Sequence, residues 1–327
     1  MRFSTSLPRS LTLLALFASM TGLSIAIAQP AFPQQTIKIV VPYAPGGGAD
    51  LLARLVGQRL SERLKQQVLV ENRGGASNTI GINAVAKAPP DGYMIGLITP
   101  VFVMTPSLLK DHPYDPLKDL TPVGMVGMTP LVLAIHPSVK ANSIAEFVQL
   151  AKSKPGAFNF ASLGAATTQG LAGTLFNNMA GIVATQIPYK GSAPGVTDLL
   201  AGNVQYMFNA LPSMLQQIKA GKLRALGVTG SMRSSLLPDV PTISESLPGY
   251  EVTTWYGFVV PAATPSSVTE YLNQELMTIV RLPDVQEKLV AAGIDPKPMT
   301  IAEAKALITS ESAKWARVIK DANIKPE

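Results

Sequence analysis

The stretch that decides the fold reads Ile37-Lys38-Ile39-Val40-Val41-Pro42-Tyr43-Ala44-Pro45-Gly46-Gly47-Gly48-Ala49-Asp50. Its β-branched start predicts a strand, its prolines and glycines predict a turn, and the amphipathic pattern that follows predicts a helix. A strand, a turn and a helix in this order leave backbone N–H groups free at the helix N-terminus, where an anion can bind. The stretch therefore predicts the first unit of an α/β fold and a place that holds a negative group.

Strand-like and helix-like segments continue to alternate along the chain, and this order predicts parallel sheets covered by helices. The expected strands are 36–41, 68–71, 93–98, 131–135, 158–161, 185–188, 204–208, 223–229 and 256–261. The expected helices are 50–65, 79–87, 143–153, 169–180, 195–201, 212–220, 268–281, 283–292 and 301–323.

These segments divide into two α/β lobes joined by two crossing strands, 131–135 and 257–261. We expect domain 1 to comprise residues 29–130 and 254–327, and domain 2 to comprise residues 131–253. A cleft between two such lobes is a common ligand site.

The first 28 residues are typical of a secretory signal peptide. Arg2 and Arg9 give a basic start, residues 11–25 are almost wholly apolar, and Ala26-Ile27-Ala28 is a small-x-small cleavage signal. We expect export with cleavage after Ala28. An uncleaved membrane anchor is the alternative, but anchors usually lack such a site.

Composition excludes several classes of protein. The 327 residues include no cysteine, so the exported chain has neither disulfides nor a lipid on an N-terminal cysteine. An exported chain without cysteine suggests a bacterial periplasm. We also expect the protein to be a monomer. The net charge of +6 falls to +4 without Arg2 and Arg9, and no basic block exists. Nucleic-acid binding is therefore not expected, whereas a mild positive field suits small anionic ligands.

The sequence contains no recognisable catalytic, metal-binding or cofactor-binding motif. His112 and His136 lie beside prolines without a second metal ligand at a suitable spacing. The triple glycine is not a Walker nucleotide loop, because no Gly-Lys-Ser/Thr follows it. It is not a dinucleotide fingerprint either, because Leu51 stands where the third glycine of the fingerprint belongs. Asp50 is best explained as a residue favoured by the helix dipole. We expect no catalytic residue, no metal and no cofactor.

A second loop of the same kind reads Ala161-Ser162-Leu163-Gly164-Ala165-Ala166-Thr167-Thr168-Gln169. It also connects a strand to a helix, and it adds hydroxyl groups that can donate to a carboxylate. Ordinary helix capping by Ser or Thr is the alternative for one such loop. Two loops in equivalent positions favour binding.

Two further residues are candidates for the same cleft. Lys190 lies in a third strand-to-helix turn and could attract an anion, although a solvated loop lysine is the simpler interpretation. Asn209 ends the expected strand 204–208 and needs hydrogen-bond partners if buried. It is therefore either a ligand contact or part of a hydrogen bond that locks the hinge.

At these residues the chain resembles the periplasmic receptors of tripartite tricarboxylate transporters, often called Bug receptors. The matching motifs are residues 41–50, Val70-Glu71-Asn72-Arg73, Ala88-Pro89-Pro90-Asp91-Gly92-Tyr93, Tyr114-Asp115-Pro116-Leu117-Lys118-Asp119, Pro188-Tyr189-Lys190-Gly191-Ser192-Ala193-Pro194, Ala220-Gly221-Lys222-Leu223-Arg224-Ala225-Leu226, Leu237-Pro238-Asp239-Val240-Pro241-Thr242 and Lys314-Trp315. They follow one another in order across essentially the whole mature chain.

The resemblance implies a fold and a site. The fold is a two-lobed Venus flytrap of the type II-like kind, which captures small carboxylated compounds and passes them to a pair of membrane permease subunits. The resemblance also implies that the carboxylate is held by backbone amides, hydroxyls and ordered water. The cleft-lining residues carried over are Tyr43, Gly46, Gly47, Gly48, Thr99, Ser162, Thr167, Thr168 and Gln169.

This chain departs from the family pattern at three positions. Asn209 stands where the family often has Asp, Gly170 where it often has His, and Leu163 where it often has a small polar residue. These changes remove polar groups, so we expect a ligand with an aromatic or otherwise less polar body behind its carboxylate. A ligand-sensing partner of a membrane sensor kinase is the alternative function, and a periplasmic enzyme is a weaker one.

Overall fold

The computed structural model describes residues 1, 32–164, 167–189, 191–321 and 324. Its contacts divide the chain into residues 1–34 and residues 35–327. The expected signal peptide and its cleavage site lie outside the described residues, apart from Met1. No helix in the described ranges is long and apolar enough to cross a membrane.

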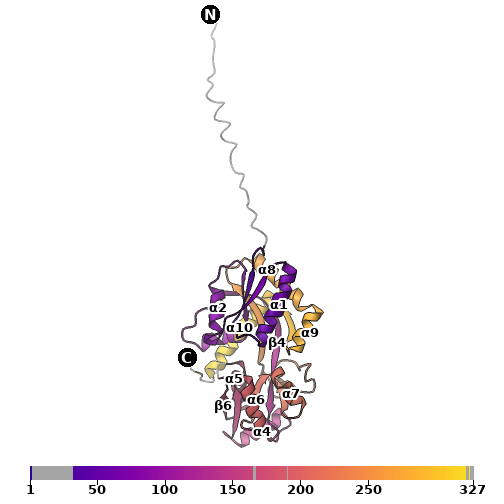
Figure 1. The fold of residues 1–327 in the computed structure, drawn as a ribbon. Coiled ribbons are helices and arrows are strands. Elements are labelled where there is room, and N and C mark those ends of the chain that lie inside the picture. The colour runs from indigo at the N-terminus through magenta and orange to yellow at the C-terminus, as the bar shows by residue number, and fades with distance from the viewer. Residues whose placement is uncertain (2–31, 165–166, 190, 322–323, 325–327) are drawn as a thin grey trace. The chain divides into compact units, whose positions relative to one another are not determined.

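One half of the folded unit, which we call lobe 1, is built on a six-stranded sheet (Figure 1). The strands β2 (Val68–Asn72), β1 (Ile37–Val41) and β3 (Met94–Ile98) run parallel, as the alternating order predicts. β9 (Thr253–Pro261) joins β3 in antiparallel fashion, and the first part of β4 (Leu120–Ile135) pairs with β9 and with β10 (Asp295–Met299).

The other half, lobe 2, is built on a five-stranded sheet that shares β4. β6 (Ala184–Pro188), β5 (Phe158–Ser162) and β7 (Tyr206–Ala210) are parallel. The last part of β4, Leu131–Ile135, pairs in antiparallel fashion with β7 and with β8 (Arg224–Val228).

The expected crossing segment 131–135 is only the end of a strand of 16 residues. β4 pairs with β9 as far as Pro130 and with β7 from Leu131 onward, so the change of sheet falls between these two residues. Buried Thr229 lies at this point, where its Oγ1 accepts from the Leu131 N–H at 2.8 Å. The expected crossing 257–261 lies inside the lobe 1 sheet, where it pairs with β3 and with the first part of β4. The second change of lobe falls earlier, at the start of β9, between Val252, whose N–H donates to the Thr229 carbonyl, and Thr253, which pairs with Pro130.

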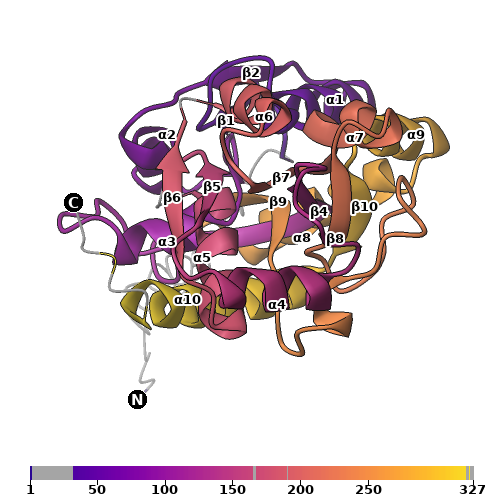
Figure 2. The same cartoon turned by 90° about the horizontal axis from the view of Figure 1, so that it is seen from below.

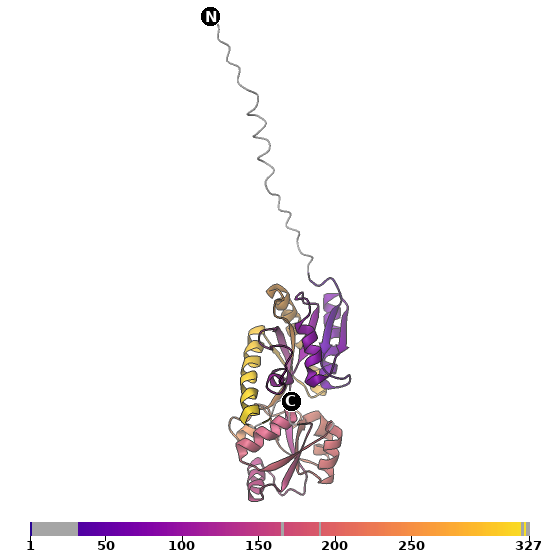
Figure 3. The same ribbon diagram turned by 90° about the vertical axis from the view of Figure 1, so that its left-hand side faces the viewer.

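Helices cover both faces of the lobe 2 sheet (Figures 2 and 3). Because side chains alternate along a strand, Leu133 and Phe208 face one side while Val132 and Met207 face the other. The first side packs against α4 (Ile144–Ser153) and α5 (Thr168–Ala180). The second packs against α6 (Ser192–Ala201) and α7 (Leu211–Lys219). The sheet is therefore buried on both faces, as the near-continuous apolar strands predict.

Lobe 1 carries the remaining helices. They are α1 (Gly48–Leu64), α2 (Thr79–Ala86), α3 (Val101–Met104), α8 (Ser266–Val280), α9 (Pro283–Ala291) and α10 (Ile301–Asp321), with short 3₁₀ turns η1 (Ala76–Asn78) and η2 (Thr105–Ser107); a third turn, η3 (Ile243–Glu245), follows β8. On α10, buried Glu311 accepts hydrogen bonds from the indole N–H groups of Trp315 and Trp255 at 2.9 and 3.4 Å. One carboxylate thus fixes α10 to the crossing strand β9.

Candidate ligand-binding cleft

The first wall of the candidate cleft is the turn between β1 and α1. Gly46 has a φ of +92°, a left-handed conformation that glycine adopts without strain. Gly47 then caps α1 without any side-chain hydrogen bond. The N–H groups of Gly48 and Ala49, in the first turn of α1, have no acceptor among the described residues. This helix start therefore offers open donors and the positive end of a helix dipole.

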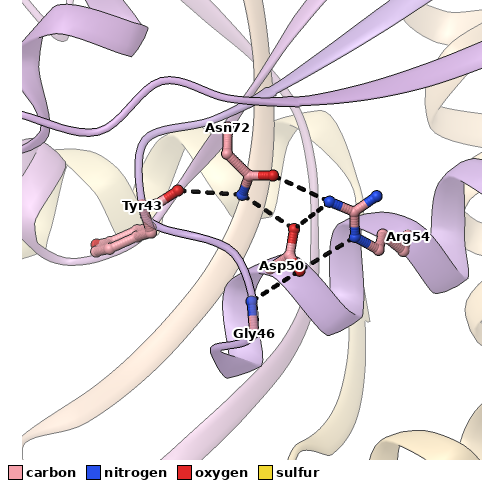
Figure 4. Close-up of polar contacts among 5 residues, drawn as sticks. All are labelled: Tyr43, Gly46, Asp50, Arg54 and Asn72. Carbon is pink, nitrogen blue, oxygen red and sulfur yellow. Dashed lines mark hydrogen bonds and ion pairs between the residues drawn. The ribbon is translucent and has the colours of Figure 1, made fainter.

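Asp50 lies behind this wall and holds its shape (Figure 4). Its carboxylate accepts from the Gly46 N–H at 3.0 Å, from Asn72 Nδ2 at 2.9 Å and from Arg54 Nε at 3.1 Å. The hydrogen bond from Arg54 is the main reason that the pKa of Asp50 lies below its usual range. The charge is paired and 95 % of the residue is buried, which supports the structural role expected for Asp50.

Two tyrosines add uncharged hydroxyl groups to this side of the cleft. Tyr43 is hydrogen-bonded through its hydroxyl to Thr99 Oγ1 at the end of β3. Burial raises the pKa of Tyr43 well above its usual range, and burial also raises the pKa of Tyr256. Both phenols therefore stay neutral at ordinary pH and act as hydrogen-bonding groups. Tyr256 comes from the crossing strand β9.

The second wall is the turn between β5 and α5. Thr167 is the N-cap of α5, since its Oγ1 accepts from the Gly170 N–H at 3.1 Å. The same hydroxyl donates to the carbonyl of Gly164 at 2.7 Å, and Gly164 has a φ of +120°. The capping alternative is thus realised at Thr167, while Thr168 and Gln169 remain at the open start of the helix.

The two helix starts line one cavity of about 540 Å³. This volume lies within the usual range for a small-molecule site. Its lining contains hydroxyl, amide, aromatic and apolar groups and backbone, with no charged side chain among the described residues. The lining residues are Tyr43, Ala44, Pro45, Gly47, Gly48, Ala49, Asn78, Thr99, Val101, Leu163, Thr167, Thr168, Gln169, Thr254 and Tyr256.

Most of the residues expected in the site lie on this cavity. They are Tyr43, Gly47, Gly48, Thr99, Thr167, Thr168 and Gln169. Gly46 is exposed in the same turn and does not line the cavity, and its N–H donates to Asp50. Lys190 falls outside the described residues.

Ser162 and Asn209 are fully buried and do not line the cavity. Ser162 Oγ accepts from the Gly164 N–H at 3.1 Å and from Gln186 Nε2 at 2.7 Å, so it braces the second wall from behind. Asn209 is part of β7, where its Oδ1 accepts from Ser192 Oγ at 3.1 Å. Its Nδ2 has no hydrogen-bond partner among the described residues.

Sequence reasoning missed Asn78, Thr254 and Tyr256. Tyr256 and Thr254 are on β9, about 200 positions away from the first wall along the chain, and only the pairing of β9 with β3 brings them to the cleft. Asn78 follows two glycines after β2, which could have marked a turn but not its direction.

The two histidines do not line the cavity: His112 contacts Thr105 Oγ1 at 2.9 Å, and His136 contacts Ser138 Oγ at 2.7 Å.

Comparison with known proteins agrees with this geometry. Residues 52–324 match the model of the family described as the tripartite tricarboxylate transporter family receptor. The chain belongs to this family. It is also 34 % identical to Protein BugT of Bordetella pertussis, over 98 % of this chain and 99 % of BugT.

Solved structures give the same fold. A protein from R. palustris, Rpa4515 with adipate, is 34 % identical, with a TM-score of 0.77 over 90 % of this chain and 100 % of that one. The periplasmic binding protein BugD is 33 % identical, with a TM-score of 0.75 over 90 % and 100 %. MatC from Rhodopseudomonas palustris with bound malate is 29 % identical, with a TM-score of 0.73 over 88 % and 100 %.

These matches confirm the expected two-lobed α/β fold and the resemblance to Bug receptors. Proteins of this family are periplasmic binding proteins and not enzymes, which excludes the enzyme alternative for this chain. The chain is a solute-binding receptor of a family in which relatives bind small carboxylates.

Proposed function

We propose that this chain captures a small organic carboxylate in the cleft of about 540 Å³ and delivers it to the permease subunits of a tripartite tricarboxylate transporter. The observation that carries the proposal is the meeting of two helix N-termini at one cavity that has no charged side chain among its described lining residues. Helix starts of this kind bind anions through oriented N–H groups.

The carboxylate would be held mainly by backbone. The N–H groups of Gly48 and Ala49 donate from α1, and those of Thr168 and Gln169 donate from α5. Hydrogen bonds to a charged acceptor are short and strong, so a few oriented amides can replace an arginine. Tyr43 and Thr99 add hydroxyls, and we assign Gly46 and Ser162 the role of keeping the two walls in place.

The lining also limits the body of the ligand. An ammonium group would need a carboxylate partner, and the described lining supplies none. Leu163, Val101 and the ring of Tyr256 offer apolar contact instead. We therefore infer a carboxylate with an aromatic or otherwise less polar body, of the size of the adipate and malate that occupy the relatives. Asn209 is proposed to tune this preference through its hydrogen bond with Ser192 at the start of α6, and Lys190 is proposed to attract the anionic ligand.

Capture would proceed by closure of domain 1 (29–130 and 254–327) on domain 2 (131–253). The crossing strands β4 and β9 connect the two, and a ligand that contacts both walls favours the closed state by the contacts made only there. We further propose that the leader is cleaved after Ala28 and that the mature chain acts in the periplasm as a monomer.

A thermal-shift screen of the mature chain tests the proposal. The panel contains malate, adipate, citrate, benzoate, phenylacetate, aspartate and glutamate, each with its uncharged amide where one exists. A ligand at about 100 times its Kd raises the free energy of unfolding by about 2.7 kcal/mol, a clear shift in Tm. We expect a carboxylate without an amino group to give the largest shift. Aspartate or glutamate as the best ligand would contradict the inferred ligand class.

Deletion of the receptor tests delivery. Loss of uptake of the identified ligand, with transcription of ligand-responsive genes unchanged, is expected for a transport receptor. Unchanged uptake with lost transcription would instead favour the sensor-partner alternative.

A further inference from the structure

The turn that follows β2 has an unusual backbone. Three consecutive residues without a glycine among them, Ala76, Ser77 and Asn78, have φ values of 45°, 52° and 72°. A left-handed backbone brings Cβ too close to the following carbonyl oxygen, at a cost that Asn tolerates better than Ala or Ser. Strain of this kind persists only where the surrounding structure holds it, and it is concentrated at binding sites.

The turn also leaves the next helix, α2, without a side-chain cap. Asn78 is the N-cap of α2, and Asn is among the best residues for accepting a hydrogen bond from the first turn of a helix. Here its side chain makes no capping hydrogen bond, because its left-handed backbone differs from the extended backbone of a capping residue. A stabilising contact that the residue type could make is therefore absent.

The carboxamide that does not cap α2 lies on the ligand cavity. Asn78 is half-buried and lines the cleft together with Tyr43 and Thr99, and its side chain makes no hydrogen bond to any described residue. A local hydrogen bond holds the turn, since Thr79 Oγ1 at the start of α2 donates to the Ala76 carbonyl at 2.7 Å. Asn78 and Gln169 are the only side-chain amides among the described lining residues, one from each lobe.

We propose that Asn78 is a specificity-determining residue that donates a hydrogen bond from its carboxamide to an oxygen of the bound ligand, and that the left-handed turn 76–78 holds it there. This inference rests on the proposed function. The ligand oxygen is one beyond the carboxylate held at α1, and a hydroxyl, a carbonyl or a second carboxylate would each accept this bond.

Three variants and one calorimetric titration test the inference. The wild type is first titrated with adipate, malate and 4-hydroxyphenylacetate, each of which has an oxygen beyond one carboxylate, and the tightest binder is then used for all variants. Asn78→Gly removes the carboxamide and is expected to raise Kd about tenfold, the effect of one hydrogen bond to a charged or polar oxygen. Asn78→Asp keeps the size and the tolerance of a left-handed backbone but replaces the donor with a negative charge, so Kd rises further.

Ala76→Gly is the matched control, since it relieves strain in the same turn and removes only an exposed methyl group. Its Tm should rise by about 2 °C, and its Kd should stay within about twofold of the wild-type value. Kd within twofold of wild type in both Asn78 variants would overturn the role of Asn78 and leave the proposed function standing. A wild type that binds no carboxylate of the panel would overturn both.

Discussion

The two walls of the cleft are both strand–turn–helix units with a left-handed glycine, yet their helices start differently. On the first wall, α1 begins at Gly47 without a side-chain cap, and the nearest carboxylate, Asp50, is turned away and paired with Arg54. On the second wall, Thr167 caps α5 and uses the Gly170 N–H. The uncapped start keeps more donors for a ligand, so the first wall is expected to hold the carboxylate more strongly.

The presence or absence of a side-chain cap also affects ligand binding and helix stability in opposite directions. A glycine N-cap forgoes the stabilisation that a Ser, Thr or Asp cap gives, but it lets a ligand approach the backbone closely. A threonine cap stabilises the helix and leaves only part of its N-terminus for the ligand. Changes at the uncapped start of α1 should therefore act mainly on affinity, and changes at the cap of α5 mainly on unfolding.

The largest effect is expected from Gly48→Pro. Proline fits the first position of a helix, and the extended backbone of Gly47 (φ −85°, ψ 173°) suits a residue before proline, so the helix is kept while one N–H is removed. Loss of that donor should raise Kd for the carboxylate about 30-fold in calorimetry.

Gly48→Ala is the control, because it adds a Cβ at the same place and keeps the N–H. Its Cβ would lie 3.3 Å from the Tyr256 hydroxyl, a contact that a small shift relieves. Kd should change less than about threefold. Equal effects of the two substitutions would mean that crowding, and not the lost donor, weakens binding.

Asp50→Asn should lower stability by about 1.5 kcal/mol, seen as a Tm about 4 °C lower. The pKa of Asp50 is lowered in the folded state, so its contribution is present above the unfolded pKa near 3.8 and is lost as pH falls through the folded pKa. The Tm difference between wild type and Asp50→Asn should therefore be full at neutral pH and shrink below pH of about 4. A difference that stays constant down to acid pH would refute the paired role of Asp50.

Thr167→Ala should have the smallest effect of the three substitutions, and it should act on stability. Loss of an N-cap costs about 1 kcal/mol, or about 3 °C in Tm. Thr167→Ser keeps the capping oxygen and should keep the wild-type Tm. If Thr167→Ala instead weakened binding more than Gly48→Pro, the ranking of the two walls would be reversed.

Much of the fold could be predicted because most elements carry a clear pattern and clear ends. The first part of β4 could not, since Pro122, Gly124, Gly127 and Pro130 interrupt it, and the strand survives through register shifts at two of these places. β10 was missed for a similar reason, because it contains Pro296 and Pro298. Long-range pairing with β9 and β4 overrides these local signals.

The site shows the same limit. Both walls were found from their glycines and hydroxyls, which lie together in the sequence. Tyr256 and Asn78 were not, because sheet pairing and a left-handed turn bring them to the cavity. Ser162 and Asn209 belong to these loops and strands by sequence, but alternation along β5 and β7 turns both side chains into the protein interior.

The central claim is that backbone amides in an uncharged cleft bind a carboxylate. The most direct measurement is a calorimetric titration of wild-type protein with the tightest carboxylate of the panel and with its uncharged amide. We expect the acid to bind about 100-fold tighter or more, since a few charge-assisted hydrogen bonds are lost in the amide. Equal affinity for the two compounds would contradict the account.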